Sequence, residues 1–276
     1  MRQPERSGPV NVSLLFLRKE LRELRKNKFV LPVYLLLPPI AVVLPVIFAS
    51  LAPAIMAIDQ KDPVVLAIHR TITTVPEFAH MGTDEAITRF FLRNLVAFYL
   101  LLPVGLSSIS AAFSIVAEKQ QRTLETILAT PITDFEFLIG KLLASLVPSI
   151  ILTWAAAILA VVIVNWTTWG KYQTALLPDR FWAIGVVVLA PLMGMASVLA
   201  AMRLSAKMTD PQSANQFTGL VIVPTFMVGI GIFGKLLTIS MTAVVIACVV
   251  VVLLALFLLR LNLKNFQREE ILTKWT

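Results

Sequence analysis

Residues 138–164 read LIGKLLASLVPSIILTWAAAILAVVIV, an apolar run in which Lys141 is the one charged residue. A helix needs about 20 residues to cross the hydrocarbon core of a bilayer, so this run is long enough to span it. Five other apolar runs reach that length, and the first is expected to be the least regular because Pro38, Pro39 and Pro45 interrupt it. The six predicted transmembrane spans are 30–50, 94–116, 138–164, 181–202, 215–234 and 239–260.

The composition is that of a polytopic membrane protein. Hydrophobic residues make up 58% of the 276 residues and charged residues 14%, whereas soluble domains average roughly 45–50% and about 25%. This excess excludes a soluble globular protein. The long apolar blocks also exclude a disordered or collagen-like chain. The chain is therefore predicted to be one all-α membrane domain over 1–276.

The positive charges indicate the orientation of these spans. The N-terminal segment and the loops on its side of the membrane hold 17 of the 24 lysines and arginines, and the other loops hold 7. Cytoplasmic loops carry the excess of lysine and arginine, so both termini are predicted to be cytoplasmic. No cleavable signal peptide is expected, because a charged segment of 28 residues precedes the first apolar run and no small-residue cleavage pattern interrupts it. We expect a multi-pass protein of a prokaryotic-type inner (plasma) membrane, with an external loop at 51–93 and a cytoplasmic tail at 261–276.

The N-terminal segment 1–29 is predicted to hold an amphipathic interfacial helix over 12–28. At 100° per residue, four leucines share one narrow stripe and five basic residues lie on the other side. Anionic lipid headgroups fit this charge better than nucleic acid, because the aromatic platform of single-strand binders is missing. A solvated basic tail is the alternative. The leucines are Leu14, Leu17, Leu21 and Leu24, and the basic residues are Arg18, Lys19, Arg22, Arg25 and Lys26.

The external loop carries few chemical signals. Its end, 84–93, reads DEAITRFFLR and is predicted to form a short helical lid, because acidic residues precede good helix formers. His69 and His80 are eleven residues apart, which is not a spacing for metal ligands. Cys248 is the one cysteine, so the chain cannot form an internal disulfide or a thiolate metal cluster.

The predicted spans lack ionisable groups at depth. No Asp, Glu or His lies in the apolar core of any span, and no HExxH or GxSxG motif is present. Intramembrane proteases and proton-driven pumps need such groups, so the sequence argues against both. Lys141 and Lys235 lie at span ends and are expected to extend their ammonium groups to the interface.

Two short motifs are interpreted as coincidental. Residues 229–236, GIGIFGKL, match part of a phosphate-binding loop but lack the Ser or Thr that holds Mg²⁺, so we read the glycines as packing and turn residues. Asn165-Trp166-Thr167 fits a glycosylation acceptor, but Trp166 and Trp169 are expected to belong to the outer aromatic belt. The chain is thus predicted to have no catalytic, metal or cofactor site, and a partner must supply the energy for any vectorial work.

The cytoplasmic loop after the second span suggests where a partner docks. Residues 117–141 read AEKQQRTLETILATPITDFEFLIGK. Leu124, Ile127 and Leu128 share one face of a short predicted helix, which ends before Pro131. Such a helix between two spans can fit a groove on a soluble partner. A connector lying flat on lipid is the alternative, and periodicity does not decide between them.

The same segment resembles the signature of ABC-2 type permeases, the transmembrane subunits of ATP-driven exporters. The resemblance rests on 118–125 (EKQQRTLE), 128–131 (LATP) and 140–141 (GK), with Arg122 at a position where Gly is common. Further support comes from 210–216 (DPQSANQ) and 266–275 (FQREEILTKW). With the layout of the spans, the resemblance covers nearly the whole chain.

The resemblance implies a permease that pairs with a second permease, identical or different, and with two cytoplasmic ABC ATPase subunits. ATP and Mg²⁺ are expected on the partner ATPase, and 118–130 would be the coupling helix. Its three apolar residues would fill a groove on the ATPase, with Glu118, Arg122 and Glu125 at the rim. The coupling residues are Glu118, Lys119, Arg122, Thr123, Leu124, Glu125, Ile127, Leu128, Thr130 and Pro131.

The translocation path is marked only by polar residues in the second and fifth spans, which the resemblance places at the dimer axis. Polar groups in a span prefer a bundle interior or a cavity, although ordinary helix–helix hydrogen bonding is the alternative. Small residues around Gly194 in the fourth span predict close packing. The path candidates are Ser107, Ser108, Ser110, Asn215, Gln216, Thr218 and Thr225.

Two other functions remain open. An ATP-independent facilitator or assembly scaffold would need no coupling helix, so substitutions in 118–131 would be silent. A lipid-acting membrane enzyme would need acidic or histidine residues clustered at one interface. The external loop offers these without a catalytic spacing, as Asp59, Asp62, His69, His80, Asp84 and Glu85. The lack of core charges favours an amphipathic or apolar substrate.

Overall fold

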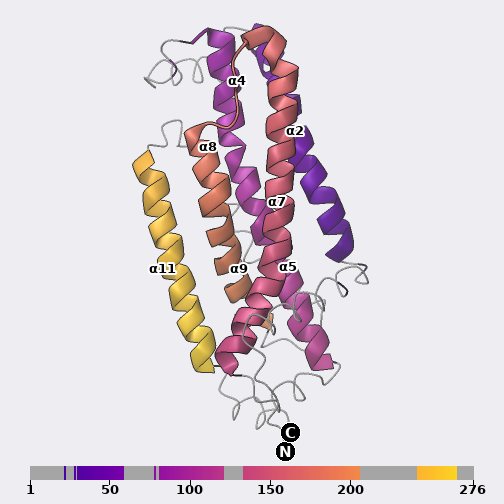
Figure 1. Ribbon diagram of the computed structural model, residues 1–276, viewed down its shortest axis with the longest axis vertical. Helices are drawn as coiled ribbons and strands as arrows, with labels where there is room; N and C mark the ends of the chain where they lie inside the picture. Colours follow the sequence, from indigo (N-terminus) through magenta and orange to yellow (C-terminus); the bar gives the residue numbers. More distant parts are fainter. Residues whose placement is uncertain are drawn as a thin grey trace, which may run out of the picture.

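A computed structural model describes residues 22, 28, 30–58, 78, 81–120, 133–205 and 241–265 (Figure 1). Every regular element among these residues is helical, so the predicted all-α class is confirmed for them. The elements are α2 (Val30–Ile58), α4 (Thr83–Asn94), α5 (Val96–Gln120), α7 (Asp134–Tyr172), α8 (Arg180–Ile184), the π-helix η2 (Gly185–Leu189), α9 (Ala190–Ser205) and α11 (Met241–Asn265).

Five of the helical stretches are long and apolar enough to cross a membrane. They correspond to the first four predicted spans and the sixth. The predicted fifth span, 215–234, lies outside the described residues, and so does nearly all of the predicted interfacial helix 12–28. The five stretches are Val30–Leu51, Asp84–Glu118, Phe135–Tyr172, Arg180–Ser205 and Val245–Lys264.

The helices share two ends, which we call the lower and upper ends as drawn in Figure 1. The lower end holds the start of α2, the end of α5, the start of α7 and the ends of α9 and α11. Helix α2 thus begins toward the end of the bundle at which α11 finishes, although its start lies higher than the end of α11 (Figure 1). Helix α9 ends at the lower end and α11 begins toward the upper end.

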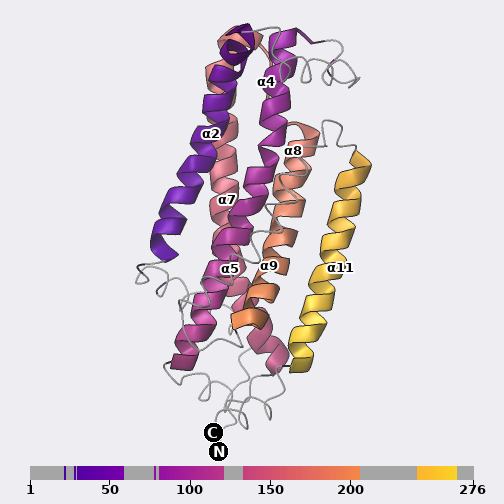
Figure 2. The ribbon, with the colours of Figure 1, turned by 180° about the vertical axis from the view of Figure 1, so that it is seen from behind.

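Helix α5 lies at the centre of the bundle. Helices α2 and α11 lie on opposite flanks, with α5, α7 and α9 between them (Figures 1 and 2). In an 18-residue apolar window of the stretch that includes α5, 78% of the residues are buried inside the chain, against 11% in the corresponding window of α11. A Cβ on Gly194 of α9 would lie 3.1 Å from Pro103 Cβ and 2.8 Å from Leu146 Cδ1. The predicted close packing at Gly194 is therefore confirmed.

The prediction that prolines interrupt the first span is wrong, because α2 is continuous from Val30 to Ile58. Pro45 has no N–H to donate to the carbonyl of Ala41, four residues earlier. The buried hydroxyl of Tyr99 on α5 donates to that carbonyl instead, at 2.8 Å. A neighbouring helix thus supplies the donor that the proline lacks, as membrane helices require.

A second proline is accommodated in the same way. In the π-helix η2, the N–H of Ala190 donates to the carbonyl of Gly185, five residues back. The next such bond would come from residue 191, which is a proline, so the carbonyl of Val186 lacks its donor. The indole Nε1 of Trp154 on α7 donates to this carbonyl at 3.2 Å.

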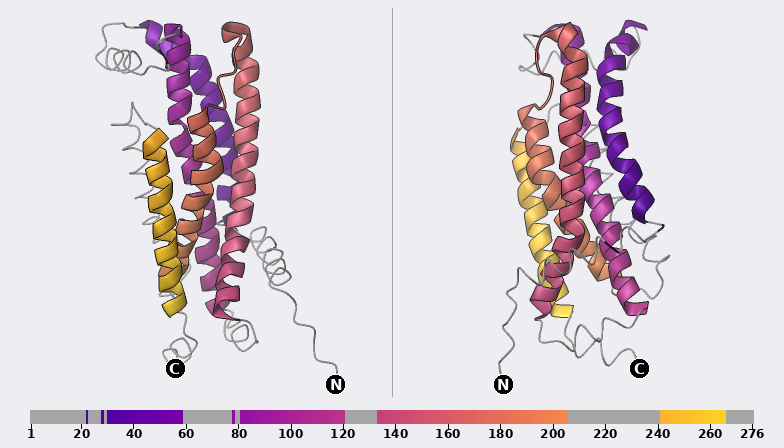
Figure 3. Two further views of the ribbon diagram at one scale, coloured as in Figure 1. Left: turned by 60° about the vertical axis from the view of Figure 1, so that its left-hand side comes forward. Right: turned by 45° about the vertical axis from the view of Figure 1, so that its right-hand side comes forward.

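The upper ends of α2, α4 and α7 extend beyond the starts of α8 and α11 (Figure 3). Helix α7 has 39 residues, which gives a length of about 58 Å at 1.5 Å per residue, against about 30 Å for a hydrocarbon core. The helix predicted at 84–93 is confirmed as α4, with Asp84 and Glu85 in its first turn. It continues α5 upward along the bundle and lengthens the second span, so it is not a separate lid.

We predict that Tyr99→Phe lowers the free energy of unfolding by about 1–3 kcal/mol, the usual cost of an unsatisfied buried carbonyl. In a Pro45→Ala background the cost should largely disappear, because residue 45 then donates to Ala41 itself. A double-mutant cycle on thermal or denaturant unfolding in detergent measures this coupling. Tyr34→Phe, which removes a different hydroxyl contact to α5, is the matched control and should cost the same in both backgrounds. Equal costs of Tyr99→Phe in the two backgrounds would contradict the assignment.

Candidate functional site

The structure describes both ends of the predicted coupling segment. Helix α5 runs through Glu118 to Gln120, and Thr133 caps the start of α7. The rest of the segment, 121–132, lies outside the described residues, as does the side chain of Lys119. The coupling residues placed there are Arg122, Thr123, Leu124, Glu125, Ile127, Leu128, Thr130 and Pro131.

A buried ion pair joins the two ends of this segment. The Nζ of Lys141 on α7 lies 2.7 Å from Oε2 of Glu118 on α5, and the two side chains are 1% and 2% exposed. Lys141 also donates to Oγ of Ser114. The Nζ lies 6.0 Å from the centre of the Phe137 ring. Each buried charge thus has an opposite charge beside it, without which its burial would be strongly destabilising.

Two sequence predictions are corrected here. Lys141 was expected to reach the membrane interface and Glu118 to stand at the rim of a docking surface, but both are buried against each other. The reason is that α7 begins at Asp134, four residues before the predicted span, and α5 continues beyond its predicted end. Both residues therefore lie on packed helices and not in an open loop.

A capping box sets the start of α7. Oγ1 of Thr133 accepts from the backbone N–H of Glu136 at 3.2 Å, and Oε2 of Glu136 accepts from the N–H of Thr133 at 2.9 Å. This arrangement satisfies two N–H groups that a helix N-terminus leaves free. The sequence prediction missed it, although Thr-Asp-Phe-Glu at 133–136 carries the signal. The cap sets where α7 starts, and the ion pair joins α5 to α7. The two ends of segment 119–140 are therefore held at a fixed position relative to each other, which we call its fixed base.

The serines proposed for the path lie inside the bundle. Ser107 donates to the carbonyls of Pro103 and Gly194 and lies 3.3 Å from Oγ of Ser197 on α9. Ser108 donates within its own helix. These contacts favour ordinary hydrogen bonding for both residues. Ser110 is also buried, and its hydroxyl has no hydrogen-bond partner among the residues that the structure describes. The other candidates, Asn215, Gln216, Thr218 and Thr225, lie outside those residues.

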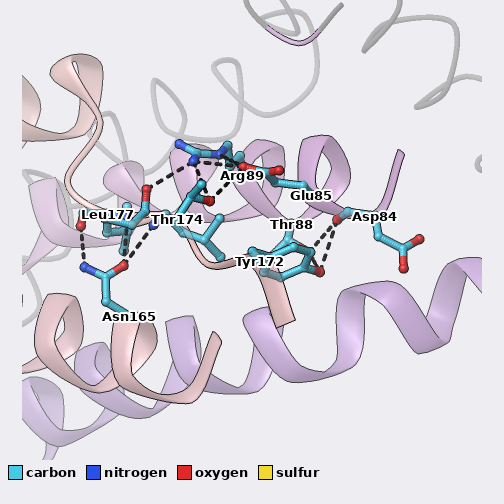
Figure 4. Close-up of polar contacts among 10 residues, drawn as sticks. Asp84, Glu85, Thr88, Arg89, Asn165, Tyr172, Thr174 and Leu177 are labelled. Atoms are coloured by element: carbon cyan, nitrogen blue, oxygen red, sulfur yellow. Dashed lines mark hydrogen bonds and ion pairs between the residues drawn. The ribbon is translucent and has the colours of Figure 1, made fainter. Parts of the chain in front are cut away.

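At the upper end, polar contacts tie α4 to the end of α7 (Figure 4). Arg89 donates from Nε to Glu85 Oε1 at 3.0 Å, and from Nη2 to Thr174 Oγ1 at 3.3 Å and the Ala175 carbonyl at 3.1 Å. The hydroxyls of Thr88 and Tyr172 are 3.1 Å apart. This end of the bundle is therefore held by side chains of both helices.

Asn165 has a structural role that the sequence analysis missed. Its Oδ1 accepts from the N–H groups of Leu176 and Leu177 at 2.9 and 3.1 Å, and its Nδ2 donates to the Leu177 carbonyl (Figure 4). The side chain thus organises the turn that leads from α7 to α8. Trp166 and Trp169, which were expected in an outer aromatic belt, are exposed on the upper part of α7.

The acidic residues considered for an enzymatic site do not form one in the described structure. Asp84 pairs with Lys171 at 3.2 Å and Glu85 pairs with Arg89. No group of three His, Cys, Asp or Glu side chains among the described residues could hold a metal ion. The remaining candidates, Asp59, Asp62, His69 and His80, lie outside those residues.

Comparison with protein families identifies the chain. A family model described as ABC-2 family transporter protein matches residues 67–273, about three quarters of the chain. The chain belongs to the ABC-2 transporter family. The match contains the coupling segment and its buried ion pair, so the resemblance inferred from the sequence is confirmed. This ABC-2 chain is a multi-pass membrane permease, a component of membrane transport. A comparison with curated protein sequences gives no match.

We predict that Lys141→Met destabilises this permease by about 3–5 kcal/mol, because it leaves the Glu118 carboxylate buried without its partner. The double variant Glu118→Gln/Lys141→Met removes both charges and should recover most of that loss. Unfolding in detergent measures both effects.

The matched control is Asp84→Asn, which breaks the exposed pair with Lys171. Exposed pairs contribute about 0–1 kcal/mol, so this variant should unfold nearly as the wild type does. If Lys141→Met were as mild as Asp84→Asn, the Glu118–Lys141 ion pair would not be what holds α5 to α7 at the lower end.

Proposed function

We propose that this chain is the permease subunit of an ATP-driven exporter, forms the membrane path for the substrate, and is energised by a separate ATPase. The observation that carries the proposal is the Glu118–Lys141 ion pair, which fixes the base of segment 119–140 in a chain of the ABC-2 family. A segment with a fixed base can pass a force from a soluble partner to the spans. The proposed location is the inner (plasma) membrane, with the lower end in the cytoplasm.

In the proposed mechanism, ATP binding closes two ATPase subunits, which press on segment 119–140 and on the N-terminal interfacial helix. ATP and Mg²⁺ bind to the ATPase, and this chain holds no cofactor. The ion pair makes α5 and α7 move together at the lower end. Because α5 lies at the centre of the bundle and packs closely on α9, the displacement reaches the bundle interior and changes access to the path.

The docking surface differs in one respect from the sequence prediction. Leu124, Ile127 and Leu128 are proposed to fill an apolar groove on the ATPase, with Arg122 and Glu125 at its rim. Glu118 is buried against Lys141 inside the bundle, so it is not a rim residue.

A second permease, identical or different, is proposed to complete the translocation path. On this chain, the path candidates are Ser110, whose hydroxyl has no bonding partner in the described structure, and the polar residues of the fifth span. Ser107 and Ser108 are assigned to helix contacts. The residues of the fifth span are Asn215, Gln216, Thr218 and Thr225.

We predict that Glu125→Arg abolishes coupling and leaves the membrane fold intact. Reversing a charge at a docking rim places like charges together and costs several kcal/mol, so ATPase recovery should fall at least about tenfold. The measurement is affinity purification from native membranes in mild detergent, followed by mass spectrometry. The wild type should retain a soluble ATPase at stoichiometric amount, and the same experiment shows whether one or two permeases are present.

The matched control is Arg260→Gln, which changes an exposed arginine of α11 outside the coupling segment. It should recover as much ATPase as the wild type. Recovery of the wild-type chain without an ATPase would favour the ATP-independent facilitator or scaffold. Normal ATPase recovery and transport by Glu125→Arg would show that the docking surface lies elsewhere.

A further inference from the structure

A pocket at the upper end has no role in the proposed coupling mechanism. It lies between the start of α4, the turn that follows α7 and the start of α8, and its volume is about 340 Å³. That volume falls within the range of small-ligand sites, about 300–1,000 Å³. Four apolar and four charged residues line it: Phe78, Met81, Arg89, Arg93, Leu176, Leu177, Asp179 and Arg180.

Most charges of the pocket are already paired within the chain. Arg93 lies 3.5 Å from Asp179 Oδ2 and its guanidinium is 4.4 Å from the centre of the Phe181 ring. The other oxygen of Asp179 accepts from the N–H of Phe181. Arg89 is paired with Glu85. Both carboxylate oxygens of Asp179 are thus engaged. Its negative charge is compensated within the chain and does not keep an anion out of the pocket.

Arg180 is the exception. Its side chain is exposed on the pocket, and it makes no hydrogen bond or ion pair among the residues that the structure describes. Arg89 uses Nε and Nη2 for its contacts, so its Nη1 is also without a hydrogen bond in the described part of the chain. The pocket thus offers guanidinium donors from two sides and carries an excess of positive charge.

The height of the pocket along the bundle indicates which layer of a membrane surrounds it. Arg180 begins α8, whose start lies near the level at which α11 begins (Figure 3). We infer that these shorter spans enter the bilayer where their helices begin, which puts the pocket at the level of the lipid headgroups. Guanidinium groups at this depth bind phosphate oxygens, often with two parallel hydrogen bonds. The apolar lining residues suit the non-polar part of the same molecule.

We propose that this pocket binds a phosphate group, with Arg180 and Arg89 donating to its oxygens and Leu176, Leu177 and Phe78 contacting the adjoining apolar portion. A membrane phospholipid and a soluble phosphate compound share this chemistry. The site lies at the end of the bundle opposite the coupling segment. It does not depend on the proposed ATPase partner, and its test is independent of that proposal.

The test is titration calorimetry on the full-length chain in uncharged maltoside micelles. Three probes are compared: dihexanoyl phosphatidylglycerol, inorganic phosphate, and dihexanoylglycerol, which lacks the phosphate. Saturable binding of the phospholipid is expected, weakened about tenfold by Arg180→Gln, which removes a charged hydrogen-bond donor. Arg260→Gln, which removes an exposed arginine from the lower half of α11, should leave the affinity unchanged. Because the Arg180 side chain is exposed and unpaired in the described structure, its replacement should not shift the unfolding midpoint.

The three probes separate the sources of the phosphate. Binding of the phospholipid but not of inorganic phosphate, with the Arg180 dependence, supports a lipid ligand. Binding of inorganic phosphate with the same dependence supports a soluble one. Equal binding of dihexanoylglycerol, or equal phospholipid affinities of Arg180→Gln and Arg260→Gln, would overturn the proposal.

Discussion

Hydrocarbon offers a backbone carbonyl no water, so each carbonyl in a membrane span must find its donor within the protein. Two prolines show how this permease meets the requirement. Pro45 leaves the Ala41 carbonyl to Tyr99 of α5, and Pro191 leaves the Val186 carbonyl to Trp154 of α7. Each proline therefore fixes its helix to one neighbour at one height. In a soluble protein such prolines would break the helix. In this permease they determine the height at which each helix contacts its neighbour.

The buried ion pair follows the same logic for charge. Neither Glu118 nor Lys141 could remain charged and buried alone, so their burial requires that α5 and α7 meet at the lower end. At the upper end, Thr88, Arg89 and Asn165 hold α4, α7 and the following turn together. Polar contacts thus determine which helices meet at each end, and apolar packing around Gly194 fills the space between.

Local patterns in the sequence predicted five apolar spans and the helix α4, which the structure confirms, whereas the predicted span 215–234 lies outside the described residues. Contacts between distant residues were not predictable in this way. Tyr99 and Ala41 are 58 residues apart, so no periodicity shows that one compensates the proline beside the other. Lys141 was misjudged for the same reason, because its partner lies on another helix. The capping box at Thr133 was local and was overlooked. The coupling segment came from its resemblance to a family, whereas the upper pocket joins arginines that the sequence separates by about ninety residues.

The fixed base of segment 119–140 has a mechanical consequence. In the proposed coupling mechanism, a load on this segment tilts α5 and α7 together, because the Glu118–Lys141 ion pair joins them. Helix α7 is about 58 Å long at 1.5 Å per residue, so a tilt of about 5° moves its upper end by about 5 Å. Its upper end is tied to α4, and the pocket between α4 and α8 is bridged by the Arg93–Asp179 ion pair. A small displacement at the lower end would thus be felt as a load on this ion pair at the opposite end of the bundle.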